Sequence, residues 1–258
     1  MNKVSIVIPA YNEEKRIGKT LETYSNYFER LRKKRELDYE ILIVINNTTD
    51  KTEYIVKAWR KKNKKIRYLN LIRGGKGYAL IEGFKDALKR DNNLIGFVDA
   101  DMATSPEYFY DLIKFIDVYD GVIASRYMKG SIIEPKPTIQ RLIAKRIFNF
   151  LIRIVLFLPY RDTQCGAKIF KRYALEKVLQ DISMSQWAFD VDLLYSLKKI
   201  GFRIKEIPTK WSDKEYSKIN FWKAGPWMAL GVIRLRMINS PLKKFVRIYD
   251  KFLGFVPK

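Results

Sequence analysis

Short apolar runs alternate along the chain with longer stretches in which apolar residues recur every three or four positions. The runs over residues 4–8, 41–45 and 66–71 have the length and the β-branched composition of buried strands. After the third run, helical spacing places apolar side chains at Leu80, Ile81, Phe84 and Leu88. Strands and helices that alternate through short connections predict an α/β domain with a doubly wound, mostly parallel sheet flanked by helices.

The second half of the chain continues this alternation. A fourth apolar run, over 95–98, leads into two acidic residues, and a fifth, over 121–125, ends at Arg126. We expect a loop over 127–137, because a glycine and two prolines interrupt any regular element there. Beyond it the pattern predicts a helix over 138–158, a strand over 167–170, a helix over 190–200 and a strand over 203–207.

The C-terminal stretch, from about Phe221 onward, is helical in pattern, basic and aromatic. Ser240 and Pro241 form a good helix start. After them, apolar residues recur at helical spacing and lysines and arginines fill the other positions, which is typical of a basic amphipathic helix in a membrane interface. The alternative is a helix packed on its own domain or on a second subunit. We therefore expect a main domain over 1–218 and a C-terminal helical, membrane-associating segment over 219–258.

Two carboxylates follow the fourth apolar run directly. Asp99 and Asp101 are alternate residues of an extended chain, so their side chains point the same way and can converge on one ion. The carboxyl end of a buried parallel strand is where open α/β sheets bind ligands. Hard cations such as Mg²⁺ or Mn²⁺ take one or two carboxylates together with the phosphates of a nucleotide. The pair is therefore a candidate metal site, with a solvated turn as the alternative.

Composition narrows the classes of function. The 258 residues include 50 Lys and Arg against 28 Asp and Glu, a net charge of +22, which favours anionic partners such as phosphorylated metabolites, acidic membranes or nucleic acid. There is no histidine, so Ser-His and Cys-His catalysis and histidine metal ligation are excluded. A single cysteine, Cys165, excludes an intramolecular disulfide. We expect neither a signal peptide, since a strand begins at Val4, nor a membrane-spanning helix.

Several motifs, in this order and spacing, resemble those of family 2 glycosyltransferases with the GT-A fold. The resemblance is nearest to the dolichyl-phosphate β-glucosyltransferase and polyprenyl-phosphate sugar synthase branch. The stretches that carry it are Ile-Pro-Ala-Tyr-Asn-Glu at 8–13, Asp-Ala-Asp at 99–101, Asp-Thr-Gln-Cys-Gly-Ala-Lys at 162–168, Trp-Ala-Phe-Asp-Val-Asp at 187–192, and residues 211–236.

This resemblance implies an inverting, metal-dependent transfer of a sugar from a nucleotide diphosphate to dolichyl or polyprenyl phosphate. It favours a UDP-sugar donor, UDP-glucose first, with GDP-mannose or a UDP-N-acetylhexosamine as alternatives. It further implies a Mg²⁺ or Mn²⁺ cofactor and a peripheral protein at the cytoplasmic face of an anionic membrane. A homo-oligomer stays open, and no nucleic acid is expected. A hypothesis from another class is a non-catalytic basic protein that binds lipid or nucleic acid; a steep salt dependence without a nucleotide-sugar requirement would reveal it.

The resemblance also assigns residues. Asp99 and Asp101 would hold the metal, and Asp101 and Asp190 are the catalytic candidates. The nucleotide-sugar site would comprise Pro9, Ala10, Tyr11, Glu13, Asn46, Lys76, Asp99, Ala100, Asp101 and Arg126. The acceptor phosphate would meet Arg141, Arg161, Gln164, Lys168 and Lys218.

Simpler roles compete with several of these assignments. Arg126 could form an ordinary surface ion pair, Lys76 could belong to a mere turn, and Asp190 could cap a helix. Arg141 could belong to a solvated basic face. Cys165 is expected to be a packed residue, and Trp187 and Trp211 are expected either to stack on the sugar or to lie in the core.

Two departures from the family pattern stand out. Asn-Asn-Thr-Thr-Asp follows Ile45 where the family usually has Asp-Asp-Gly-Ser-Thr-Asp, whose acids help to read the nucleotide base. An asparagine both donates and accepts hydrogen bonds, whereas an ionised aspartate only accepts. Ala103 stands where mannosyltransferase relatives often place a glutamine, which agrees better with the glucosyltransferase branch.

Overall fold

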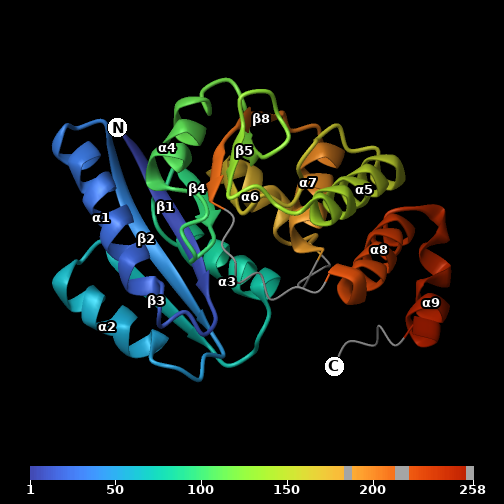
Figure 1. Ribbon diagram of the computed structural model, residues 1–258, viewed down its shortest axis with the longest axis horizontal. Helices are drawn as coiled ribbons and strands as arrows, with labels where there is room; N and C mark the ends of the chain where they lie inside the picture. Colours follow the sequence, from blue (N-terminus) through green and yellow to red (C-terminus); the bar gives the residue numbers. More distant parts are fainter. Residues whose placement is uncertain (183–187, 213–220, 254–258) are drawn as a thin grey trace.

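A seven-stranded sheet forms the centre of the computed structural model, which describes residues 1–182, 188–212 and 221–253 (Figure 1). The strand order is β3-β2-β1-β4-β7-β5-β8, and all neighbours are parallel except β7, which runs antiparallel to β4 and β5. The strands are β1 (Asn2–Ala10), β2 (Leu37–Asn46), β3 (Ile66–Leu71), β4 (Leu94–Val98), β5 (Gly121–Ser125), β7 (Ala167–Lys171) and β8 (Ile204–Pro208). The predicted mostly parallel, doubly wound sheet is confirmed.

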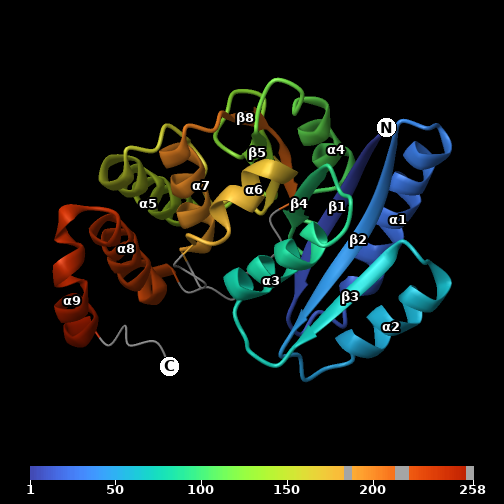
Figure 2. The same cartoon turned by 180° about the vertical axis from the view of Figure 1, so that it is seen from behind.

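Helices cover both faces of this sheet. In chain order they are α1 (Ile17–Lys33), α2 (Thr52–Lys62), α3 (Lys76–Leu88), α4 (Pro106–Lys114), α5 (Ile139–Leu156), α6 (Arg172–Val178), α7 (Phe189–Ile200), α8 (Phe221–Ile238), the 3₁₀ helix η1 (Pro241–Phe245) and α9 (Val246–Leu253). Helices α1, α2 and α4 contribute to one core cluster, and α3 with α5 to α8 contribute to the other. Figure 2 shows the molecule from the opposite side, with α3 and α6 toward the viewer.

The alternation of side chains along the strands explains the two cores. Ile41, Ile43 and Ile45 of β2 belong to the cluster beneath α1, whereas Leu42 and Val44 belong to the cluster beneath α3. A strand that is apolar at every position is therefore buried on both faces, as parallel sheets require. The continuous apolar runs in the sequence have this origin.

Two predicted segments differ from the structure. The segment over 127–137, predicted as a loop, contains the short strand β6 (Ile132–Glu134), which pairs in parallel with β9 (Lys210–Ser212) to form a second, two-stranded sheet. Three-residue strands carry too little alternation to be recognised in a sequence. The helix predicted over 138–158 ends at Leu156, because Phe157 takes a left-handed backbone conformation with φ of 54°.

The C-terminal helices pack on the main domain. Met228, Val232 and Leu235 of α8 are buried in the cluster that also contains residues of α5 and α7. Ser240 caps η1 as predicted, since its hydroxyl accepts a hydrogen bond of 3.2 Å from the amide of Leu242. The predicted boundary at residue 218 lies outside the described residues, so the division there stays a prediction. Within 1–182, 188–212 and 221–253, we find no helix with the length and apolar character that a bilayer crossing demands.

The close contact between α3 and the sheet depends on Gly83. A Cβ atom at this position would lie 2.6 Å from Cγ1 of Val7 and 2.8 Å from Cγ2 of Val44. We expect Gly83→Ala to lower the free energy of unfolding by about 1–3 kcal/mol, because neither buried valine has room to move away. Urea unfolding would measure the change.

Gly18 provides the matched control, because its Cβ would meet other atoms only at 3.8 Å and 3.9 Å. Gly18→Ala should leave stability unchanged or raise it by up to about 1 kcal/mol through helix propensity. Equal losses in the two variants would contradict the packing argument.

Candidate active site

The strands β1 and β4 lie next to each other, at the point where the order of strands in the sheet reverses. Asp99 and Asp101 follow the carboxyl end of β4. Helix α1 holds the loop that contains them, since Thr20 donates to the carbonyl of Ala100 at 2.7 Å. The side chain of Asp101 accepts a hydrogen bond of 2.9 Å from the amide of Ala103. The loop is therefore fixed from both sides.

Gly166 fixes the position of Asp99 from the opposite side. The amide of Asp99 donates to the carbonyl of Gly166 at 3.2 Å. A Cβ atom at residue 166 would lie only 2.0 Å from Oδ2 of Asp99, so the backbone passes directly against the carboxylate. The antiparallel direction of β7 causes this contact, because Val98 pairs with Ala167 at the start of β7. Only glycine permits this approach.

Lys76 places a positive charge among the carboxylates of the site. It is the first residue of α3, and its ammonium forms an ion pair with Asp99. Burial opposes its charged form, but the carboxylates of Asp99, Asp190 and Asp101 outweigh that effect and raise the pKa of Lys76 above its ordinary value. Burial and the charge of Asp99 raise the pKa of Asp101. Lys76 therefore lies within the electrostatic reach of all three carboxylates and is paired directly with Asp99.

Lys168 lies beneath Asp190. The lysine side chain is fully buried, and its ammonium donates to Oδ1 of Asp190 at 2.6 Å and to the carbonyl of Cys165 at 2.6 Å. The same ammonium lies 5.1 Å from the centre of the Phe97 ring. Asp190 lies in the first turn of α7 and is largely covered. The role of Lys168 at the acceptor phosphate stays a prediction, and the contact that the structure gives it is with Asp190.

Arg126 is held by a buried carboxylate. It donates to Asp162 from its backbone amide at 3.0 Å and from two guanidinium nitrogens at 2.7 Å and 2.8 Å. Burial opposes ionisation of Asp162, but Arg126 outweighs it and lowers the pKa of the carboxyl. The guanidinium lies 4.9 Å from the ring centre of Trp211, which is buried. Asp162 is not among the predicted site residues, although a carboxylate of opposite charge to Arg126 in a motif of its own was an available signal.

The base-reading candidate, Asn46, carries an unpaired acceptor. It lies at the carboxyl end of β2, is 4% exposed, and its side-chain oxygen has no hydrogen-bond partner among the described residues. A buried unpaired polar atom costs free energy unless a ligand satisfies it.

The loops after β1 and β2 bind each other through side chains. The side chain of Asn12 accepts from the amide of Thr49 at 2.9 Å, and the backbone amide of Asn12 donates to the hydroxyl of Thr48 at 3.1 Å. Asp50 accepts from the amides of Glu14 and Thr52 and from the Thr48 hydroxyl. Burial opposes this carboxylate, but these hydrogen bonds lower the pKa of Asp50 to about 2. The polar segment that replaces the usual acidic motif therefore has a structural role.

The other predicted nucleotide-sugar residues lie at or just after the carboxyl ends of β1 and β4. Ala10 and Ala100 are buried, Pro9 is half-buried and Tyr11 is exposed. The carboxylate of Glu13 forms a two-pronged ion pair with Arg16, at 2.6 Å and 2.7 Å.

The predicted acceptor residues are less completely placed. Arg161 is exposed, and its backbone amide donates to Glu206 at 2.9 Å. Gln164 is half-buried in the loop before β7. Arg141 lies on α5, but its side chain is outside the description, and Lys218 and Trp187 are outside the described residues. These assignments stay predictions.

Cys165 is packed rather than reactive. Its side chain is fully buried, and burial with the charge of Asp162 raises the pKa of the thiol to about 12. The group therefore stays protonated at neutral pH, as expected of a packed residue.

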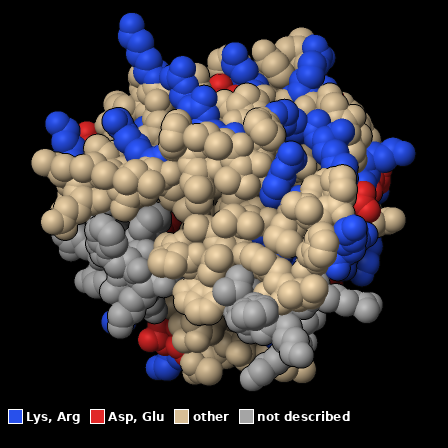
Figure 3. All heavy atoms as spheres, turned by 90° about the vertical axis from the view of Figure 1, so that its right-hand side faces the viewer, with Lys and Arg blue, Asp and Glu red and all other residues tan. Residues whose placement is uncertain are grey.

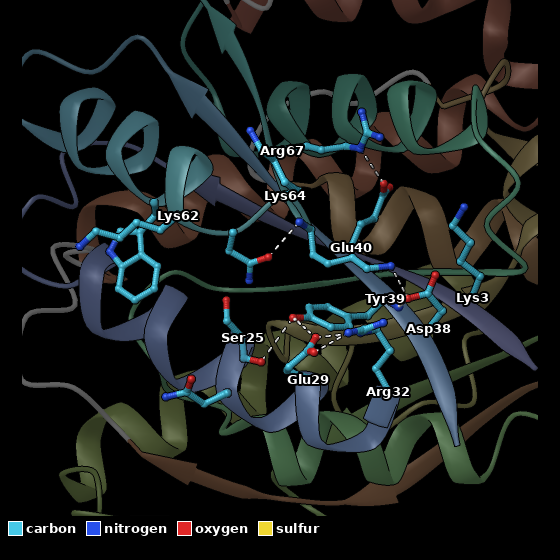
Figure 4. Close-up of a pocket in the computed structure, with 14 residues that line it drawn as sticks. Lys3, Ser25, Glu29, Arg32, Asp38, Tyr39, Glu40, Lys62, Lys64 and Arg67 are labelled. Atoms are coloured by element: carbon cyan, nitrogen blue, oxygen red, sulfur yellow. Dashed lines mark hydrogen bonds and ion pairs between the residues drawn. The ribbon is translucent and has the colours of Figure 1, made fainter. Parts of the chain in front are cut away.

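A separate cavity of about 600 Å³ lies near the amino ends of β1 and β2 (Figure 4). It is lined by both charges, and its carboxylates are already paired with its cations. Glu29 binds Arg32 at 2.6 Å, Glu40 binds Arg67 at 3.1 Å, and Asp38 binds Lys65. The three carboxylates of this cavity are all paired and its cations outnumber them, so it differs from the cluster of carboxylates around Asp99.

The donor set suits a metal that shares its ligands with a substrate. Among the residues that the structure describes, no three His, Cys, Asp or Glu side chains form a ready-made metal cluster. Asp99 and Asp101 offer two carboxylates, which is the number of protein ligands that Mg²⁺ commonly takes beside nucleotide phosphates. The backbone of Gly166 packs directly against the Asp99 carboxylate and so fixes the position of one of these two candidate ligands.

Comparison with known proteins agrees with this geometry. The model of Glycosyl transferase family 2 matches residues 5–179. A dolichyl-phosphate beta-glucosyltransferase of Drosophila melanogaster is 31% identical over 242 residues, which cover 89% of this chain and 72% of the fly protein. The protein of that description from Homo sapiens is 30% identical over 258 residues, covering 92% of this chain and 76% of the human one.

A solved structure confirms the fold. The glucosyl-3-phosphoglycerate synthase from Mycobacterium tuberculosis, in complex with Mn²⁺, uridine diphosphate and glucosyl-3-phosphoglycerate, superposes with a TM-score of 0.65 at 17% identity. The match covers 92% of this chain and 79% of that one. The family match, the two relatives and the GT-A architecture lead to one assignment: the chain is a glycosyltransferase and belongs to glycosyltransferase family 2.

Proposed function

We propose that this protein transfers glucose, with inversion, from UDP-glucose to dolichyl or polyprenyl phosphate, and that it requires Mg²⁺ or Mn²⁺. The observation that carries the proposal is the convergence of Asp99, Asp101 and Asp190 around Lys76. The fly and human relatives, named as dolichyl-phosphate beta-glucosyltransferases, support the acceptor and the sugar. The alternatives are GDP-mannose and a UDP-N-acetylhexosamine as donors.

On the donor side, Asp99 and Asp101 would hold the metal. A bound divalent cation would supply Lewis-acid neutralisation of the diphosphate that leaves. Lys76 adds a positive charge beside Asp99, at the amino end of α3, where backbone amides also favour an anion. The Mn²⁺ in the mycobacterial synthase supports a divalent ion but does not choose between Mg²⁺ and Mn²⁺.

On the acceptor side, no strong general base is required. A phosphate oxygen is already a nucleophile at neutral pH, so it can attack the anomeric carbon while UDP departs with the electron pair of the broken bond. Attack on the face opposite to UDP inverts the configuration at that carbon. Asp190 would orient the acceptor or accept its residual proton, and Lys168 fixes the Asp190 carboxylate for that task. A chain without histidine is compatible with this chemistry.

Uracil suits the unpaired acceptor at Asn46. The N3–H group of uracil is a donor flanked by two carbonyl acceptors, and an asparagine amide can both accept and donate. UDP in the mycobacterial synthase is compatible with this proposal. The C-terminal segment over 219–258 would associate with the cytoplasmic face of the membrane, where the lipid acceptor lies, and the protein would be peripheral there.

The metal role of Asp101 is tested by Asp101→Asn, which keeps shape and removes charge. We expect glucosyl transfer to fall by at least about a hundredfold, with the melting temperature preserved. The reason is that the metal ion that neutralises the leaving diphosphate would lose one of its protein ligands. Asp111→Asn, which changes a surface aspartate paired with Lys114, is the matched control and should keep full activity. Turnover by Asp101→Asn at excess Mg²⁺ or Mn²⁺ would remove Asp101 from the metal site.

The position of Lys168 is tested by Lys168→Met. We expect kcat to fall about tenfold or more while the KM for the lipid phosphate changes little, because the lost contact is with Asp190. Lys171→Met, at the end of the same strand, is the control and should keep both constants. A raised acceptor KM with an unchanged kcat would instead place Lys168 at the acceptor phosphate.

The base contact is tested by Asn46→Ala. The dissociation constant for UDP, measured by calorimetry with Mn²⁺ present, should rise by about tenfold, which corresponds to one lost hydrogen bond. Stability should not fall, since among the described residues the side-chain oxygen has no hydrogen-bond partner to lose. Unchanged UDP affinity would show that the base is read elsewhere.

A further inference from the structure

Helix α5 has an apolar face on the outside of the molecule as well as on the inside. Its inner face buries Phe148, Ile152 and Leu156 in the core. A second stripe, whose members are spaced four, four, three, four and three residues apart, points outward, and each member is more than half exposed. The outer stripe consists of Ile139, Ile143, Ile147, Phe150, Ile154 and, just beyond the helix, Phe157. Residues at this spacing lie in one row along a helix.

A continuous apolar row of this size is unusual on a water-exposed surface, and such rows mark interaction sites. Three further exposed apolar side chains, Leu242, Phe245 and Ile248, lie at the same end of the molecule on η1 and α9. The ring of Phe157 lies 5.2 Å from the guanidinium of Arg236, which links the end of the stripe to α8. Figure 3 shows this end as a broad area free of charged side chains.

The charged side chains around the outer stripe are mostly positive, and this favours an anionic partner. Helices α5, α8 and η1 contain no aspartate or glutamate, and the one acid of α9, Asp250, is paired with Arg234 at 2.6 Å. Arg146 and Arg153 flank the stripe and are exposed. Most charge at the border of the uncharged area in Figure 3 is that of Lys and Arg. Contact between two copies of this surface would oppose like charges, whereas an anionic lipid surface would neutralise them.

The inner face of α5 connects the stripe to the active site. Asn149 is buried and accepts from the amide and the hydroxyl of Thr163, both at 3.2 Å. Thr163 follows Asp162, which holds Arg126, and precedes Gly166, which packs against Asp99. One helix therefore presents an apolar row outward and fixes the loop of the site inward.

We propose that the outer stripe of α5 lies in the interface of an anionic bilayer, with its apolar side chains among the acyl chains and its arginines at the lipid phosphates. This places the loop over 162–166 at the depth where the phosphate of a membrane-bound acceptor lies. Docking itself depends on the stripe and its charge, and only the identity of that acceptor rests on the proposed function. A membrane contact through α5 adds to the one predicted for the C-terminal segment.

The test is co-sedimentation of the full chain with vesicles of phosphatidylcholine and phosphatidylglycerol. We expect the double variant Ile147→Ser, Phe150→Ser to bind these vesicles more than about tenfold more weakly, since two large apolar side chains no longer leave water. The matched control, Phe115→Ser with Val118→Ser, changes an equally exposed aromatic and branched pair at the end of α4 and should bind normally. Equal vesicle binding by the two double variants would overturn the proposal.

Two further measurements test the role of the arginines and the alternative of an interface between two copies of the chain. Arg146→Gln with Arg153→Gln should weaken binding to phosphatidylglycerol vesicles and leave the weak binding to phosphatidylcholine vesicles unchanged. The molar mass in solution is measured without lipid; a wild-type dimer that the Ile147, Phe150 variant converts to a monomer would show an interface between copies and contradict the lipid assignment.

Failure of docking and failure of the proposed function are distinguishable with a short-chain, water-soluble polyprenyl phosphate. The Ile147, Phe150 variant should glucosylate it at the wild-type rate but should transfer poorly to a long-chain acceptor in vesicles. Normal transfer to the vesicle acceptor would overturn docking and leave the function intact. No transfer to either acceptor by the wild type, with vesicle binding retained, would overturn the function and leave docking intact.

Discussion

The compensation of three carboxylates by two lysines is the constraint on which the site depends. Asp99 and Asp101 come from the end of β4, and Asp190 comes from the first turn of α7. Their mutual repulsion is relieved by Lys76 at the rim and Lys168 below. A site held in this way is prepared for further cations and for the anionic groups that accompany them, which is the requirement of a nucleotide diphosphate.

The fold supplies these charges from elements that are far apart in the sequence. The antiparallel strand β7 is central, because its first residues run against the end of β4 and bring Gly166 to Asp99 and Lys168 beneath Asp190. The loop before β7 is in turn fixed by Asn149 of α5 and by the ion pair between Asp162 and Arg126. The motif over 162–168 therefore supports the site from below, and most of its polar side chains bind other protein groups.

Much of this arrangement could be predicted from the sequence, and the limits have physical causes. The strand over 121–125 was located correctly, because a short apolar run has few other structures open to it. The apolar run over 95–98 was located in the same way, and this drew attention to Asp99 and Asp101, which follow it. The strand over 66–71 was also located correctly, although Arg67 and Asn70 interrupt its apolar residues. The partner of Lys168 could not be predicted, since Asp190 lies on another element 22 positions away and a lysine in a strand gives no sign of the face it occupies. The outer stripe of α5 was hidden as well, because a helix apolar on two faces has the sequence of a buried helix.

The burial of Lys168 also changes how the acceptor residues are understood. A cation in a motif next to a phosphate-binding loop is naturally assigned to the phosphate, yet this ammonium is fully enclosed and already satisfied by a carboxylate and a carbonyl. Its charge still contributes to the site through Asp190. Direct binding of the acceptor phosphate would then fall to more exposed cations, of which Arg161 is one.

The most direct test of the account is a transfer assay with purified protein and polyprenyl phosphate, with and without Mg²⁺ or Mn²⁺. UDP-glucose, UDP-N-acetylglucosamine and GDP-mannose would be supplied separately, and the lipid fraction would be read by mass spectrometry. The account predicts a hexosyl phosphate lipid from UDP-glucose alone, and only with the divalent metal. A product from GDP-mannose instead, or no product from any donor although the nucleotide and the lipid bind, would contradict it.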